Sequence, residues 1–323
     1  MTKKISRLFA WGFEGTTVSR PIRSLLKERP PAGVILFKRN LEGLRQLRSL
    51  TADLQAASVS PLLIGIDEEG GRVTRLPAPW TPLPPAALLG KLKDPQIIFD
   101  AGRYLGRTLR SLGINTDFAP VLDVDSNPKN PIIGDRAFSK DPQAAARDAV
   151  AFFQGLQKEG IIACGKHFPG HGDTSTDSHL TLPVVTKGER QLEKIELFPF
   201  RKAIQAGIPM IMTAHVVYPA WDQTRPATLS PFILQELLRK RIGFKGVIVS
   251  DDLNMKGIAD HYELSEAVLL GLEAGIDLFL ICRGGEKGEE ILQKVSKEIE
   301  KSPALLKRIE GSLRRTSHLN MRC

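Results

Sequence analysis

A loop rich in histidine and aspartate stands out as the segment of this chain best equipped for chemistry. Residues 166–179 read KHFPGHGDTSTDSH, and Pro169 and Gly170 exclude a regular helix or strand there. Asp177 and His179 are two residues apart, so in an extended segment their side chains share one side. Histidine has an unperturbed pKa of about 6.5, and a carboxylate partner orients the ring for proton transfer at neutral pH. The pair is therefore a candidate for general acid/base catalysis, and the alternative is a surface loop with incidental polar residues.

Metal binding is the main competing hypothesis for the same loop. His167 and His171 have the i, i+4 spacing of helical zinc ligands, but the intervening Pro169 and Gly170 deny them a helix. No H-E-x-x-H motif occurs in the chain. We therefore predict neither a metal nor a cofactor, and expect His171 to fix the loop through hydrogen bonds.

A pair of aspartates closes another apolar segment, VIVSDDLNM. Asp251 and Asp252 are adjacent, so strand parity sends their side chains to opposite sides and only one can face a site. Two carboxyl groups, or a carboxylate with a separate proton donor, are the minimum equipment for cleaving a glycosidic bond. One aspartate is thus a candidate nucleophile and the other a cap for the following helix, and parity alone does not distinguish them.

Acidic and basic residues also alternate around a pair of glycines in residues 65–76, GIDEEGGRVTRL. The glycines permit a tight turn that brings Asp67, Arg72 and Arg75 toward one pocket. Such a mixture suits a polyhydroxylated ligand, whose hydroxyls both donate and accept, although a structural ion pair is the equal alternative. Arg136, in the motif GDRAF, is placed in a similar loop further along the chain.

The elements that must hold these residues form a repeating pattern of apolar strands and amphipathic helices. Strands are predicted at residues 7–12, 33–37, 61–67, 115–120, 161–168, 209–215, 246–252 and 276–282. Three of the helices between them are expected to begin after the capping residues Asp141, Ser230 and Ser265. Near-continuous apolar strands alternating with helices indicate a parallel sheet, and eight units favour a (β/α)8 TIM-type barrel over an open doubly wound sheet. We predict a single catalytic domain over residues 1–323, with C-terminal helices from about residue 285.

In such a barrel, catalytic residues gather where the strands end. The predicted strands end on ionisable side chains repeatedly, namely Asp67, Asp117, Lys166 with His167, His215, and Asp251 with Asp252. This coincidence at one rim predicts an enzyme.

Composition narrows the class of protein further. The formal net charge is +9, but no nucleic-acid motif accompanies it and aromatic residues make up only 6% of the chain. Three scattered cysteines do not form a disulfide framework, and no apolar stretch approaches a membrane span or a cleaved signal. We therefore expect a cytoplasmic monomer that binds neither nucleic acid nor membranes and whose partner is a small saccharide or muropeptide substrate.

Several motifs in order resemble glycoside hydrolase family 3, in particular its single-domain bacterial β-N-acetylglucosaminidases of peptidoglycan recycling. They are KHFPGHGDTSTDSHLTLP, IDEEGGRVTRL, DFAPVLDV, GDRAF, MTAHV and VSDDLNM. The resemblance implies that Asp251 is the nucleophile of a covalent glycosyl-enzyme and that His179 is the acid/base, with Asp177 as its partner. It also implies a metal-free site in which the terminal N-acetylglucosamine is held by Asp67, Arg75, Arg136, Lys166 and His167.

The implied reaction removes terminal β-1,4-linked N-acetylglucosamine from cytoplasmic muropeptides, such as N-acetylglucosaminyl-anhydro-N-acetylmuramic acid with or without peptide. Three alternatives accompany it. A histidine in place of a carboxylic acid does not repel phosphate, which favours a β-N-acetylglucosaminide phosphorylase as the second candidate, and a related family 3 glycosidase of different specificity belongs with it. A substrate-assisted mechanism would leave Asp251 only a stabilising role. A non-catalytic sugar-binding or nucleic-acid-associated barrel is the third. Two segments match the family pattern less well, namely the N-terminal region and CRGGEKGEE.

Overall fold

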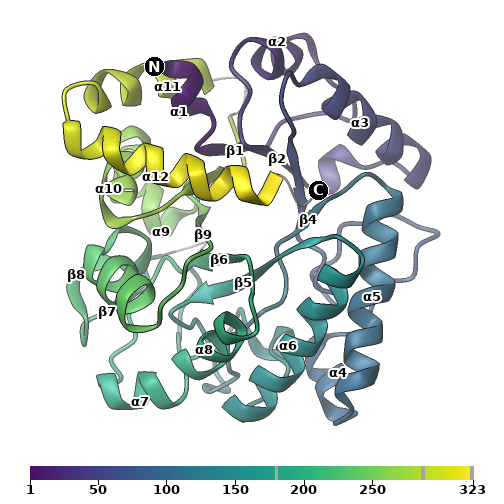
Figure 1. Ribbon diagram of the computed structural model, residues 1–323. Coiled ribbons are helices and arrows are strands. Elements are labelled where there is room, and N and C mark those ends of the chain that lie inside the picture. Colours follow the sequence, from purple (N-terminus) through teal and green to yellow (C-terminus); the bar gives the residue numbers. More distant parts are fainter. Residues whose placement is uncertain (179–180, 285–287, 321–323) are drawn as a thin grey trace.

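Eight parallel strands close into a barrel in the computed structural model, which describes residues 1–178, 181–284 and 288–320 (Figure 1). In ring order they are β1 (Phe9–Trp11), β2 (Gly33–Leu36), β3 (Leu63–Ile66), β4 (Thr116–Asp117), β5 (Ile162–Phe168), β6 (Met210–Thr213), β9 (Val247–Asp252) and β10 (Leu278–Ile281), and β10 pairs with β1. Each strand lies within a segment predicted as a strand, so the (β/α)8 prediction is confirmed. A small antiparallel pair, β7 (Val217–Tyr218) and β8 (Asp222–Pro226), is inserted between β6 and β9.

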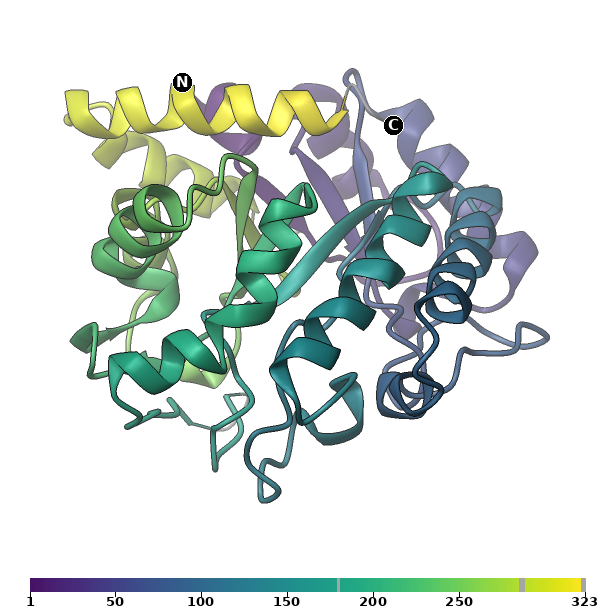
Figure 2. The same cartoon turned by 60° about the horizontal axis from the view of Figure 1, so that its bottom comes forward.

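Helices surround the barrel and cover its outer face (Figures 1 and 2). They are α1 (Thr2–Ser6), α2 (Arg20–Glu28), α3 (Leu44–Ala57), α4 (Ala86–Lys91), α5 (Pro95–Ser111), α6 (Pro142–Lys158), α7 (Glu189–Lys194), α8 (Leu197–Gln205), the π-helix η4 (Phe232–Arg241), α9 (Lys256–Ala259), α10 (Leu264–Ala274), α11 (Gly288–Ile299) and α12 (Pro303–Asn320). Short 3-10 turns are η1 (Lys38–Asn40), η2 (Gly134–Arg136) and η3 (Ala227–Leu229). Within the described ranges, none of the helices combines the length and apolar character that crossing a bilayer requires.

The apolar core has two layers, one inside the barrel and one between the strands and the helices. Ile35, Leu63, Met210 and Val247 belong to the inner cluster, and Leu319 of α12 packs with them. Since α12 crosses one end of the barrel, its last described turn closes the inner core from that side (Figures 1 and 2). Two helices, α11 and α12, follow β10 in the described part of the chain.

Two helices of the shell begin at an acidic capping residue. Asp141 caps α6 as predicted, and its carboxylate accepts the Ala144 amide at 2.8 Å. Ser265 was expected to cap the following helix, but that expectation is wrong by two positions. The helix begins at residue 264, and Glu263 is the cap because its carboxylate accepts the amides of Ser265 and Glu266. The side chain of Glu263 thus satisfies two of the amides that the first turn of α10 leaves without a helical partner.

A buried carboxylate joins the helical shell to the entrance of β10. Asp277 is fully buried and accepts hydrogen bonds from Arg239 at 2.6 Å, Arg315 at 2.7 Å and Ser312 at 2.7 Å. It also accepts the amide of Ile248 at 2.9 Å, at the start of β9. A single side chain thus fastens η4 and α12 to two adjacent strands.

Replacing this carboxylate should destabilise the fold strongly. We expect Asp277→Ala to lower the free energy of unfolding by about 3–5 kcal/mol, because two guanidinium groups lose a buried partner. Chemical denaturation followed by circular dichroism measures this. The control is Glu298→Ala, whose pair with Lys301 is exposed and should contribute about 0–1 kcal/mol. Equal losses in the two variants would contradict the anchoring role.

Candidate active site

The loop after β3 is built around a buried glutamate that the sequence analysis did not single out. Glu68 is fully buried, and its Oε2 accepts the amides of Arg75 at 2.7 Å and Leu76 at 3.0 Å. Its own amide donates to Asp117 Oδ1 at 3.0 Å. Burial raises the pKa of Glu68, while these bonds oppose the rise. The glutamate thereby folds the loop back on itself and sets Asp67 beside the barrel mouth.

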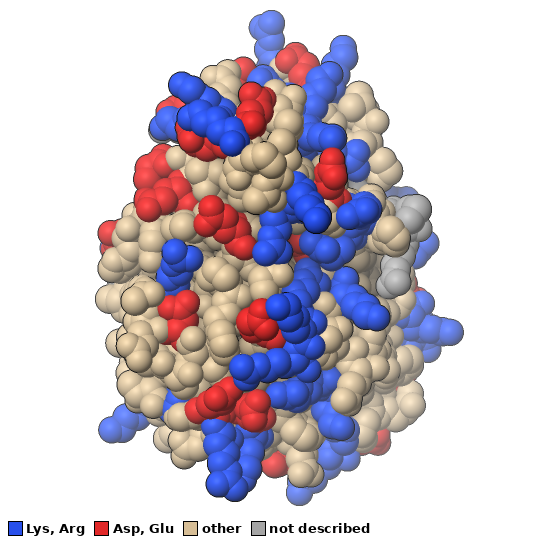
Figure 3. Space-filling model, turned by 60° about the vertical axis from the view of Figure 1, so that its left-hand side comes forward, with Lys and Arg blue, Asp and Glu red and all other residues tan. Residues whose placement is uncertain are grey.

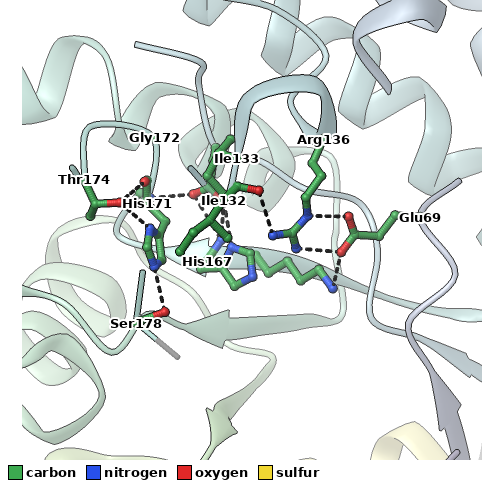
Figure 4. A network of polar contacts seen from close by, with 12 residues as sticks. Glu69, Ile132, Ile133, Arg136, His167, His171, Gly172, Thr174 and Ser178 are labelled. Carbon is green, nitrogen blue, oxygen red and sulfur yellow. Dashed lines mark hydrogen bonds and ion pairs between the residues drawn. The ribbon is translucent and has the colours of Figure 1, made fainter. Parts of the chain in front are cut away.

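Lys166, at the end of β5, lies between two carboxylates of that loop. Its ammonium is 2.8 Å from Asp67 Oδ1 and 2.7 Å from Glu69 Oε1. Arg136 approaches Glu69 from the other side with a two-pronged contact, 2.8 Å at each oxygen (Figure 4). Arg75 is 3.7 Å from Asp67 Oδ2. The predicted ligands Asp67, Arg75, Arg136 and Lys166 therefore come together, with Glu69 at their centre.

The charges of this cluster hold one another in the ionised state. Burial alone would raise the pKa of Glu69, but the charges and hydrogen bonds of Arg136 and Lys166 outweigh it and hold that pKa well below its usual value. Conversely, burial opposes ionisation of Lys166 and Arg136, yet the nearby carboxylates raise both pKa values above the usual range. The cluster is thus a fixed array of charged donors and acceptors near neutral pH.

His167 is held by a second buried carboxylate, Asp123, in the segment after β4. Asp123 Oδ2 lies 2.7 Å from His167 Nδ1, and the same carboxylate accepts the amides of His167 at 3.2 Å and His171 at 2.6 Å. Because a carboxylate accepts, Nδ1 carries a proton, so Nε2 is the ring nitrogen left for a ligand. His167 borders the pocket.

His171 fixes the loop that follows β5, as the sequence predicted. Its Nδ1 lies 2.9 Å from Thr174 Oγ1 and its Nε2 lies 3.1 Å from Ser178 Oγ, so both ring nitrogens are engaged within the loop (Figure 4). Asn130 adds hydrogen bonds from its side chain to the carbonyls of His171 and Gly172. In the described part of the chain, no group of three or more His, Cys, Asp or Glu side chains is arranged to hold a metal ion.

The buried His171 ring should make stability depend on pH. Burial, with the nearby His167 ring, lowers the pKa of His171 to about 4. The unfolded chain therefore binds a proton more readily, and the stabilisation is complete above pH 6.5 and lost as pH falls toward 4. We expect His171→Gln to remove a component on the order of 3 kcal/mol from the acid-side loss of stability.

Denaturation midpoints measured between pH 7.5 and pH 4 test this, with His261→Gln as the control because His261 is exposed. If the His171 variant and the wild type lose stability in parallel as the pH falls, the buried His171 ring does not cause the acid-side loss.

The two aspartates of β9, Asp251 and Asp252, have different surroundings, as expected for adjacent residues of a strand. Asp251 lines the pocket, and its Oδ1 accepts the amide of Asp252 at 2.8 Å. Asp252 Oδ1 accepts the amides of Asn254 at 3.0 Å and Cys282 at 2.9 Å, which ties β9 to the end of β10. Burial raises the pKa of Asp252. The structure therefore favours Asp251 as the residue for chemistry, and Asp252 caps loop amides and not a helix.

His215, which also ends a strand, supports this pair from behind. It is fully buried, its Nε2 lies 3.0 Å from the carbonyl oxygen of Asp252, and its Nδ1 lies 2.8 Å from Thr228 Oγ1. Since a carbonyl only accepts, Nε2 is protonated. His215 positions the backbone of β9 and is not among the residues that border the pocket.

These residues enclose a cavity of about 260 Å³ at the C-terminal ends of the strands. Its lining comprises Asp67, Glu69, Arg72, Val73, Arg75, Pro131, Ile132, Arg136, Lys166, His167, His171, Asp177, Ser178, Met212 and Asp251. Arg72 is also engaged outward, with Asp135 at 2.8 Å. Of the acid/base pair, Asp177 borders the cavity, whereas the predicted His179 lies outside the described residues. A second cavity of about 240 Å³ adjoins the first through Asp67, Arg75, Met212 and Asp251.

Comparisons with known proteins agree with this arrangement. The model of the glycosyl hydrolase family 3 N terminal domain matches residues 1–319. A β-hexosaminidase of Nitrosomonas eutropha is 40% identical over 290 residues, which are 88% of this chain and 83% of that protein.

Two solved structures extend the comparison. A family 3 β-N-acetylglucosaminidase from Paenibacillus sp. str. FPU-7 superposes with a TM-score of 0.96 at 39% identity, and the match covers 100% of this chain and 62% of that one, so this chain spans less than two thirds of that enzyme. NagZ from Neisseria gonorrhoeae, in complex with N-trifluoroacetyl-D-glucosamine, superposes with a TM-score of 0.81 at 33% identity over 96% of this chain and 98% of that one.

Proposed function

This chain belongs to glycosyl hydrolase family 3 and is a glycoside hydrolase, and we propose that it is a retaining exo-β-N-acetylglucosaminidase. Its substrates would be muropeptides that carry a terminal β-1,4-linked N-acetylglucosamine, as in peptidoglycan recycling. The observation that carries the proposal is the polar cavity with Asp251 at its edge, whose volume of about 260 Å³ suits a single sugar ring. Relatives named for activity on N-acetylglucosamine support the choice of sugar.

The charged cluster supplies the groups that a sugar ring needs. Asp67 and Glu69 accept hydrogen bonds from hydroxyls, whereas Lys166 and Arg75 donate to them. Because their mutual contacts fix them before a ligand arrives, little ordering is required on binding. Arg136 borders the cavity, but its two-pronged contact goes to Glu69, so it contributes to sugar binding chiefly by holding that carboxylate.

In the proposed mechanism the carboxylate of Asp251 attacks the anomeric carbon and displaces the leaving oxygen. His179, oriented by Asp177, gives that oxygen a proton as the glycosidic bond breaks. The neutral imidazole then takes a proton from water, which attacks the glycosyl-aspartate and releases the sugar with its β configuration retained. The pinned loop of residues 171–178 supports this role, because it brings Asp177 to the cavity.

Product analysis tests the choice of substrate. The expected result is release of free N-acetylglucosamine from N-acetylglucosaminyl-anhydro-N-acetylmuramic acid, with the same product in phosphate-free and phosphate-containing buffer. Detection of the sugar 1-phosphate would turn the assignment toward phosphorolysis. Faster cleavage of β-glucosides than of β-N-acetylglucosaminides would overturn the substrate itself.

The proposal places the enzyme in the cytoplasm as a monomer that meets its substrate without a cofactor. Cys164 and Cys282 are buried free thiols, which is in keeping with a reducing compartment. Cell fractionation and light scattering test the location and the oligomeric state. Activity recovered in an extracytoplasmic fraction would contradict the proposed location.

A further inference from the structure

A large cavity lies at the end of the barrel opposite the candidate active site. It has a volume of about 470 Å³ and is formed by the segments that precede β6 and β9, together with α12. Its lining residues are Gly207, Ile208, Pro209, Lys245, Gly246, Val247, Gly311, Arg314, Arg315, His318 and Leu319. This volume is in the range of cavities that hold small molecules.

The lining of this cavity carries charge of one sign. Lys245, Arg314, Arg315 and His318 are basic, and no Asp or Glu is among the described residues that line it. Lys245 and Arg314 are exposed and form no ion pair with other residues of the described ranges. Figure 3, which brings the side with α10 and α12 forward, shows Lys and Arg side chains gathered in a band across this part of the surface. The surrounding field therefore attracts anions.

One of the basic groups is held in place from below. Arg315 donates from Nε at 3.0 Å and from Nη2 at 2.7 Å to the buried Asp277, so its guanidinium is oriented before any ligand binds. Asp277 also forms an ion pair with Arg239, so one carboxylate contacts two guanidinium groups. Burial lowers the pKa of Arg239 to about 10; the charge of Asp277 opposes this shift, and the positive charges of Arg315 and Arg308 add to it. Positive charge thus remains in excess beside the cavity.

Glycines border the cavity next to that guanidinium. A Cβ added at Gly311 would lie 3.4 Å from Arg315 Nη2, an ordinary van der Waals distance, and a Cβ added at Gly207 would have no atom within 4 Å. At Gly246 an added Cβ would lie 2.3 Å from the Pro209 carbonyl oxygen, so the packing of the two segments that precede β6 and β9 requires that glycine. The fixed arginine therefore has free space in front of it and further cations around that space.

We propose that this cavity binds a small phosphorylated molecule. A phosphate dianion matches the N–H groups of the pre-oriented Arg315 guanidinium that Asp277 does not use, together with the exposed cations of Lys245 and Arg314. The volume exceeds what a lone phosphate fills, so the ligand has a sugar-sized body as well as the phosphate. The inference is independent of the proposed glycosidase function, because the cavity lies at the other end of the barrel.

Isothermal titration calorimetry at moderate ionic strength tests the proposal with glucose 6-phosphate, and with glucose as the neutral comparison. We expect saturable binding of the phosphate ester and none of glucose. The double variant Lys245→Glu and Arg314→Glu should weaken binding about tenfold or more, because two contacts to the anion become repulsive. Lys297→Glu with Arg45→Glu is the matched control, since both are exposed and lie on other helices, and it should change affinity less than about twofold.

A titration in saturating N-acetylglucosamine separates this cavity from the cationic active site, and the proposal expects unchanged affinity there. Absence of binding to the wild type at millimolar ligand overturns the proposal. Equal weakening of the binding affinity in the control variant also overturns it, because that result would mean diffuse attraction to the surface. Loss of binding in the presence of N-acetylglucosamine overturns it as well. Tighter, competing binding of duplex DNA to the same residues would instead assign the surface to a polymer.

Discussion

Asp251→Asn is expected to lower kcat for hydrolysis of an aryl β-N-acetylglucosaminide by about 10³-fold or more, because the amide cannot form a stable covalent intermediate. Asp251 borders the cavity beside the charged cluster, and its backbone is supported through Asp252 and His215. The substitution preserves shape, so the KM should change little by comparison. Release of nitrophenol measures both quantities.

The adjacent aspartate provides the matched control. Asp252→Asn removes the same charge one residue away, but its side-chain oxygen can still accept the amides of Asn254 and Cys282. We expect it to keep kcat within about tenfold of the wild type. An inactive Asp252→Asn variant together with an active Asp251→Asn variant would show that Asp252, and not Asp251, is the nucleophile.

The second large effect should come from His179 and should depend on the leaving group. His179→Ala is expected to slow cleavage of a saccharide leaving group by about 10²–10⁴-fold, the usual contribution of a general acid. An activated nitrophenyl leaving group needs little protonation, so the glycosylation step with that substrate should be slowed much less. Comparing kcat/KM for the disaccharide and the aryl glycoside measures the difference.

Asp177 supplies the control for this prediction. Asp177→Asn retains the proton donor but removes the charge that would orient it, so its loss should be smaller than that of His179→Ala and of the same kind. Loss of rate that is equal for both leaving groups in the His179 variant would contradict a role in proton donation. It would point to a structural role for the loop instead.

The barrel could be predicted because its strands are buried on both faces. Continuous apolar runs such as residues 209–212 and 246–249 are typical of strands in a parallel sheet covered by helices, and all eight barrel strands lie in the predicted segments. Local detail was harder to predict. The segment after Ser230 forms the π-helix η4 where an ordinary helix was expected, and Ser230 Oγ accepts the Ile233 amide at 3.3 Å near its start. Such a choice depends on packing that the periodicity does not record.

The site could be predicted in its outline because parallel strands bring their C-terminal ends to one rim. Asp67, Arg75, Lys166, His167 and Asp251 all border the same cavity. The buried carboxylates that hold them were missed. These carboxylates are Glu68, Glu69 and Asp123. They lie within acidic runs or apolar segments, and the sequence does not indicate which donor each carboxylate oxygen will accept a hydrogen bond from.

Covalent glycosylation of Asp251 during turnover, which we propose, can be observed by mass spectrometry. The enzyme is treated with a 5-fluoro derivative of N-acetylglucosaminyl fluoride, which slows hydrolysis of the intermediate. We expect one added glycosyl mass, located by proteolysis on the peptide that contains Asp251. A label on another residue would contradict the assignment of the nucleophile, and an enzyme that turns the reagent over without ever carrying a label would instead favour participation of the substrate's own acetamido group.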